Sequence, residues 1–130
     1  MAVNIVNVTT INGITTGYTP SVNTAVVLLP NASGSNNVFK IDQVMVANLT
    51  SSAATATLQY YSNGAVAQGS APSGGSVVSS LAYQVSVPPN ASVILSDKTT
   101  AFYLVDGNSI TVTSGTASAL SYTVSYELIS

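Results

Sequence analysis

Apolar and polar residues alternate strictly near the C-terminal end of the chain, and this two-residue period constrains the fold more than any other feature. The apolar positions are Leu120, Tyr122, Val124, Tyr126 and Leu128, and every residue between them is polar. Successive side chains of an extended strand point to opposite faces, so the pattern predicts a strand with one buried and one solvated face. No segment shows the 3.6-residue apolar period of a helix.

Other segments carry strand patterns of two kinds. Residues 54–61, 81–87 and 109–113 alternate, and in the second of these Leu81, Tyr83, Val85 and Val87 share the face that we expect to be buried. Residues 24–29 and 39–47 are denser in apolar side chains, which is typical of strands covered on both faces. Within 39–47 the phase slips at Asp42, which predicts a β-bulge.

Turn residues separate these segments. Asn63-Gly64 and Asp106-Gly107 are typical of tight hairpin turns, in which both central residues adopt positive φ. Asn48 and Asn90 are interpreted as residues that close a strand and shape a turn. About eight strands at this spacing predict an all-β fold: a single antiparallel β-sandwich, jelly-roll or immunoglobulin-like.

The domain organisation follows from length and from a change in pattern near residue 20. A chain of 130 residues fits one domain. We assign residues 21–130 to the sandwich. Residues 1–20 form either its first strand or an N-terminal arm that pairs with a neighbouring subunit.

Charge is scarce in this chain. Only 5% of the residues are charged, against about 25% in typical soluble domains. Polarity comes instead from 35 Ser and Thr residues and 11 Asn residues. Such a surface lacks the charge repulsion that keeps ordinary domains apart, so we expect a protein that works in an assembly. With two lysines and no arginine, a nucleic-acid partner is not expected.

The inventory of reactive side chains argues against catalysis. The sequence has no His and no Cys, which removes Ser-His and Cys-His pairs, ordinary zinc sites and imidazole proton transfer. Asp97, Asp106 and Asn108 lie close enough in sequence for a calcium site to be considered, but turn and strand-end roles are favoured. We therefore expect no enzyme activity, no catalytic residue, no metal site and no cofactor.

Seven tyrosines raise the alternative of a carbohydrate-binding surface. Tyr60, Tyr83, Tyr122 and Tyr126 lie in phase with apolar faces, so we expect them in the core or at its rim. This leaves three tyrosines as exposed contact residues for a sugar or a partner protein: Tyr18, Tyr61 and Tyr103.

Several segments of the chain form a further pattern: residues 40–50 with the alternating segment that follows, Val87 to Leu95, Tyr103-Leu104, Gly107 to Ile110, and Val124 to Glu127. In these segments the chain resembles small virion proteins of tailed bacteriophages, cyanophages among them. The resemblance covers roughly residues 24–129. Gly107-Asn108 stands where Gly-Asp is expected, which removes one candidate metal ligand. The resemblance implies a non-enzymatic structural component of a virion.

Composition and resemblance together predict a β-sandwich protein that stabilises a phage capsid as a decoration (cement) protein. The expected partners are further copies of the chain, as a trimer for example, and other virion proteins such as the major capsid protein, with no membrane partner. A neck, tail or baseplate component and a glycan-binding module are the alternatives. Residues 1–4 lack the basic segment of a secretory signal, so synthesis in the host cytoplasm is expected.

Overall fold

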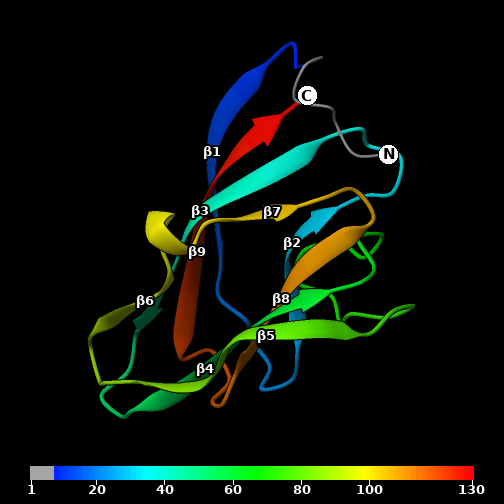
Figure 1. Ribbon diagram of the computed structural model, residues 1–130. Helices are drawn as coiled ribbons and strands as arrows, with labels where there is room; N and C mark the ends of the chain where they lie inside the picture. Colours follow the sequence, from blue (N-terminus) through cyan, green and yellow to red (C-terminus); the bar gives the residue numbers. More distant parts are fainter. Residues whose placement is uncertain (1–7) are drawn as a thin grey trace.

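The computed structural model describes residues 8–130, which form two antiparallel sheets packed face to face (Figure 1). Sheet A contains, in spatial order, β1 (Ile11–Tyr18), β9 (Leu120–Ile129), β3 (Val38–Asn48) and β6 (Ser92–Ser96), and β7 (Phe102–Leu104) also pairs with β3. Sheet B contains β2 (Val26–Asn31), β8 (Asn108–Ser114), β4 (Ala54–Tyr61) and β5 (Val77–Val87). The predicted all-β sandwich is confirmed.

The strands pair in a nested order. β1 pairs with β9, β2 with β8, and β4 with β5, while β6 and β7 both pair with the same edge of β3. The short 3₁₀ turn η2 (Lys98–Thr100) separates β6 from β7, so these two strands act as one interrupted strand. The first strand pairs with the last, the second with the second-last, and so on inward. This is the strand order of a jelly roll, one of the two predicted architectures.

The core lies between the two sheets and is built from the alternating positions. Tyr122 and Val124 on β9 are fully buried, as the period predicts, and Ile41 and Val44 on β3 lie opposite this strand. The ladder between β3 and β9 shifts register between Ile41 and Gln43, which confirms the bulge at Asp42. On β2, residues 26–29 are all buried, as expected of a strand covered on both faces.

Buried polar groups are tied to the backbone. The Tyr122 hydroxyl donates to the Thr113 carbonyl oxygen at 3.2 Å and contacts Ser114 Oγ at 3.1 Å. Asn48 closes β3: its Nδ2 donates to the carbonyl oxygens of Ser52 and Val87 at 2.8 and 3.0 Å, and its Oδ1 accepts from the Thr50 amide at 2.9 Å. These contacts satisfy groups that would otherwise be costly to bury.

Several sequence-based turn predictions have clear outcomes. Asn90 has φ 54° and shapes the turn between β5 and β6, as expected. The hairpin prediction for Asn63-Gly64 is wrong, because residues 62–76 form one long connection. The hairpin prediction for Asp106-Gly107 is also wrong: Gly107 has φ 84°, but it links β7 of sheet A to β8 of sheet B.

The N-terminal region divides into two parts. Residues 11–18 form β1, which pairs with β9 of the same chain, so they belong to the sandwich. The predicted intersubunit arm falls in part on residues 1–7, which lie outside the described residues. No helix in the described part of the chain is long and apolar enough to cross a membrane.

Replacing Tyr122 with Phe tests the buried hydroxyl. The variant should lose about 1 kcal/mol of unfolding free energy at pH 7, because the Thr113 and Ser114 groups lose their partner. Burial also raises the pKa of Tyr122, so its contribution to stability is present below pH 10 and declines as the pH rises through the folded-state pKa.

The measurement is urea unfolding at pH 7 and at strongly alkaline pH. The Tyr122→Phe variant should lose less stability between the two conditions than the parent protein does. Tyr83→Phe, at an exposed position, is the control and should behave like the parent. If the parent and the variant lost the same unfolding free energy at alkaline pH, the stabilising role of the buried Tyr122 hydroxyl would be contradicted.

Candidate functional site

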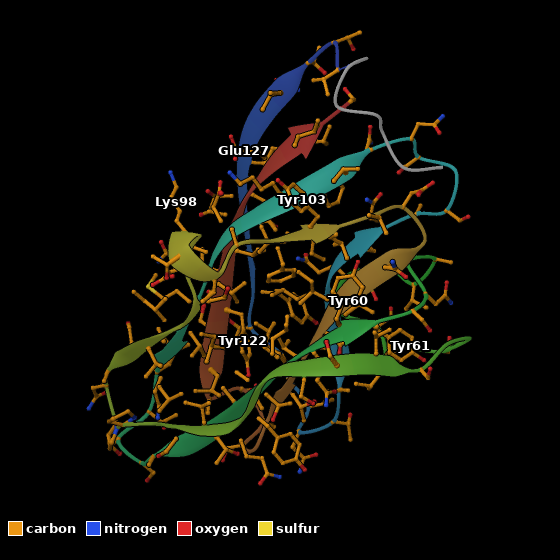
Figure 2. All side chains as sticks on the ribbon, viewed as in Figure 1. Tyr60, Tyr61, Lys98, Tyr103, Tyr122 and Glu127 are labelled. Carbon is orange, nitrogen blue, oxygen red and sulfur yellow. The ribbon has the colours of Figure 1, made fainter. Side chains whose placement is uncertain are left out.

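The few charged side chains all lie on sheet A or in turns. Lys40 and Asp42 are on β3, Glu127 is on β9, and the remaining three are at η2 and in the turn after β7. Figure 2 labels Glu127 and, at η2, Lys98. Lys40 Nζ lies 3.7 Å from Glu127 Oε2 at an exposed site, where an ion pair contributes little. None of the residues in the four strands of sheet B is charged. One of the two layers is therefore electrostatically neutral throughout its strands.

Within residues 8–130, no three carboxylates lie close enough together to hold a metal ion. Asp97 caps η2: its Oδ1 accepts from the amide and hydroxyl of Thr99 at 2.9 and 2.6 Å, and these bonds lower its pKa. Asn108, the other oxygen donor weighed for calcium, instead donates to the Tyr60 hydroxyl at 3.2 Å. Turn and strand-end roles for Asp97 and Asn108 are confirmed. Asp42 Oδ1, on the bulge, is buried without a hydrogen-bond partner.

The connection formed by residues 62–76 covers the β2 edge of sheet B. It leaves β4, crosses the end of β8 and reaches β2, the edge strand on the far side. There the Gly69 amide donates to the Val27 carbonyl oxygen at 2.8 Å, the Val27 amide donates to the Ser70 carbonyl oxygen at 2.9 Å, and Gln68 Nε2 donates to the Leu28 carbonyl oxygen at 2.7 Å. The backbone groups of β2 at Val27 are thus satisfied by the chain itself.

Gly64 anchors the start of this connection. Its amide donates to the Gly107 carbonyl oxygen at 3.0 Å, and a Cβ atom at this position would lie 2.1 Å from the Asn31 carbonyl oxygen. Asn63 contributes as well, because its carbonyl oxygen accepts from Ser109 Oγ at 2.8 Å. The glycine is required here for close backbone approach, and not for the positive φ that the hairpin prediction assumed.

β5, the opposite edge strand of sheet B, contains three register shifts against β4. Its eleven residues face the eight of β4, and the extra residues change which side chains point inward. Val85 and Ala82 lie opposite the inward-facing Ala56 and Leu58. The predicted burial of Leu81 and Tyr83 is therefore wrong: they are 38% and 64% exposed.

β5 carries a concentration of exposed apolar side chains. Within residues 8–130, nine large apolar side chains are exposed, and four of these are on β5, one on β6 and one on β7. β5, β6 and β7 are the edge strands on one side of the sandwich (Figure 1). The term β5 surface is used below for the four side chains on β5: Val77, Val78, Leu81 and Tyr83.

The three tyrosines expected at the surface have different environments. Tyr103, on β7, is 56% exposed as predicted, whereas Tyr61 is 7% exposed, so its predicted exposure is wrong (Figure 2). Tyr61 is the last residue of β4 and lies opposite Val77. Tyr18 packs partly against the core and lies next to Gly69. These three residues do not form one aromatic surface.

Sequence reasoning missed the β5 surface. The signal was the stretch Val77-Val78-Ser79-Ser80-Leu81, in which two apolar residues are followed by two polar ones and the two-residue period fails. Such a break indicates bulges in a strand. Nearby, an open hollow of about 290 Å³ is lined by small and hydroxylated residues, without charge or aromatic rings: Ala53, Ala54, Thr55, Ser86, Gly115 and Thr116.

Comparison with protein-family models, with curated protein sequences and with solved structures finds no match to this chain.

Replacing Gly64 with Ala tests the anchor of the 62–76 connection. The added methyl group would collide with the backbone of Asn31 and Asn108, so the unfolding free energy should fall by about 2–3 kcal/mol. Gly13→Ala on β1 is the matched control, because nothing lies within 4 Å of its Cβ position, and its effect should stay within about 0.5 kcal/mol. Urea unfolding measures both. Similar losses in the two variants would contradict the packing described.

Proposed function

We propose that this chain is a non-enzymatic structural protein of a phage virion, acting as a capsid decoration protein that stabilises the head through subunit contacts. The observation that carries the proposal is the β5 surface: four exposed apolar side chains on the open edge of a sheet whose strands have no charge. Val77 and Val78 are adjacent, Leu81 and Tyr83 follow within five residues on the same strand, and exposed apolar side chains gathered on one edge strand favour packing against another molecule.

The neutral composition of sheet B favours burial over chemistry. Charged groups must be paired or desolvated when a surface is covered, and this is expensive. Ser, Thr and apolar residues, which dominate β4, β5 and β8, carry no such cost. A neighbouring subunit that covers this side of the sandwich therefore gains apolar burial without leaving a buried charge unpaired. The mechanism is association, with no bond made or broken.

The carboxylates support a non-enzymatic role. Asp97 is engaged in capping η2, and Glu127 faces Lys40 on the solvated face of sheet A. Glycoside hydrolysis needs two carboxyl groups facing one another across a bound sugar. The exposed Tyr103 and Tyr83 lie on strands of different sheets, which gives little support to a glycan-binding module.

The fold and the resemblance of residues 24–129 to small phage virion proteins support the virion assignment. Jelly rolls are used in viral capsid proteins and also in lectins, so the fold by itself is an analogy. The resemblance and the uncharged surface together favour the capsid. Other virion positions, in the neck, tail or baseplate, would use the same surface with fewer copies.

The number of copies per particle distinguishes a decoration protein of the shell from a component of the neck, tail or baseplate. A decoration protein should be present at a number comparable to that of the major capsid protein, because it occupies repeated sites on the shell. Quantitative mass spectrometry of purified particles, with isotope-labelled peptides of this chain and of the shell protein, measures the ratio. A few to a few dozen copies per particle would rule out decoration and favour the neck or tail, and absence from particles would reject the virion proposal.

A further inference from the structure

We infer that the β5 surface binds the same surface of a second copy of this chain, so that the protein forms a two-fold dimer through β5. This inference names a partner for the proposed assembly role and rests on that role. Its test uses the purified chain alone, and therefore does not depend on the particle in which the protein works.

β5 is the best-suited of the four sandwich edges for such a contact. The β2 edge is closed by the 62–76 connection through Gly69, Ser70 and Gln68. The β6–β7 edge is interrupted by η2, and short edge strands are a known protection against pairing. β1 exposes a single large apolar side chain, Ile11, whereas β5 exposes four.

Charge favours a copy of the chain itself as the occupant. A partner with charged groups opposite β5 would have to bury them without an opposite charge, because β5 and its neighbour β4 have none. The β5 surface of a second copy is uncharged and apolar, and therefore fits this requirement. No lysine or aspartate on β5 opposes self-association, although such residues commonly protect edge strands.

The exposed area is adequate for a weak dimer. The four side chains are 47%, 62%, 38% and 64% exposed, in the order Val77, Val78, Leu81 and Tyr83. From the area that such side chains bury, this amounts to roughly 300 Å² of apolar surface per copy. Two copies contribute about 600 Å² of apolar surface, and the exposed serines and Gln84 of β5 add polar area toward the roughly 1,200 Å² at the lower end of specific interfaces. A dissociation constant in the micromolar range is expected for such a contact.

The register shifts determine the kind of contact. A regular ladder between two β5 strands would be broken at the bulges, so the contact is made by side chains more than by backbone pairing. In a two-fold contact each copy presents the same surface, so an apolar surface is complementary to itself. Within residues 8–130, the large exposed apolar residues outside β5, β6 and β7 are Ile11 on β1, Val22 between β1 and β2, and Leu49 between β3 and β4, and no other strand exposes as many as β5.

Sedimentation velocity of the purified chain, from about 1 μM to about 1 mM, tests the inference. A concentration-dependent dimer is expected. Tyr83→Ser and Val78→Ser should each raise the dissociation constant at least about tenfold, since they remove the two most exposed apolar side chains of the β5 surface. Leu49→Ser is the matched control, because Leu49 is 60% exposed and lies outside β5, and it should leave the constant unchanged. Unchanged urea midpoints would show that the variants fold.

Deuterium exchange locates the contact independently. Peptides covering residues 77–87 should exchange more slowly as the dimer forms, while peptides covering β1 should not change. A monomer at every concentration, a trimer, or a dimer that Tyr83→Ser and Val78→Ser leave intact would overturn the inference. Shell-like copy numbers on particles together with a monomer in solution would overturn the dimer alone and leave the virion role standing.

Discussion

Strand β9 is the constraint on which the rest of sheet A depends. It pairs with β1 along one edge and with β3 along the other, so its register determines the register of both. Its strict two-residue period directs Tyr122 and Val124 into the core and their polar neighbours to solvent. A one-residue slip on either side would turn every one of these side chains to the wrong face. The strongest sequence pattern therefore lies where an error of register would be most costly.

The sequence predicts the fold well wherever local pattern and packing agree. β9, the buried β2 and the bulge on β3 are all visible in the sequence, because a sheet on one or both sides enforces the period. Prediction fails at β5, since a free edge tolerates bulges that change the phase of its side chains. It fails again at Asn63-Gly64, where a distant backbone, that of Asn31, decides the geometry.

The candidate surface was less predictable than the fold. Of the three tyrosines chosen from the sequence as contact residues, Tyr103 is clearly exposed, Tyr18 is half-buried and Tyr61 is buried. Tyr61 stands at the end of β4, where the alternating pattern stops, so nothing in the sequence around it indicates whether it is buried. The absence of charge from the strands of sheet B is readable in the sequence only once the strands have been assigned to sheets.

The protein uses neutral hydrogen bonds where most domains of this size use ions. Asn31 donates to the carbonyl oxygens of Asn37 and Leu104 at 3.0 Å each, and so joins the end of β2 to β7. The Tyr60 hydroxyl donates to the Tyr103 carbonyl oxygen at 3.3 Å and bridges the two sheets. Such bonds are insensitive to salt, unlike exposed ion pairs. The architecture should therefore respond little to ionic strength.

The nested strand order has a consequence for how the molecule acquires its structure. Ile11 lies opposite Ile129, so the outermost pair joins residues from nearly opposite ends of the chain. Contacts between such distant segments carry a large entropic cost of loop closure, and all-β domains of this kind fold in roughly milliseconds to seconds. During synthesis on a ribosome, β1 would remain unpaired until β9 had emerged. β9 thus completes the sheet that β1, which is synthesised earlier, begins.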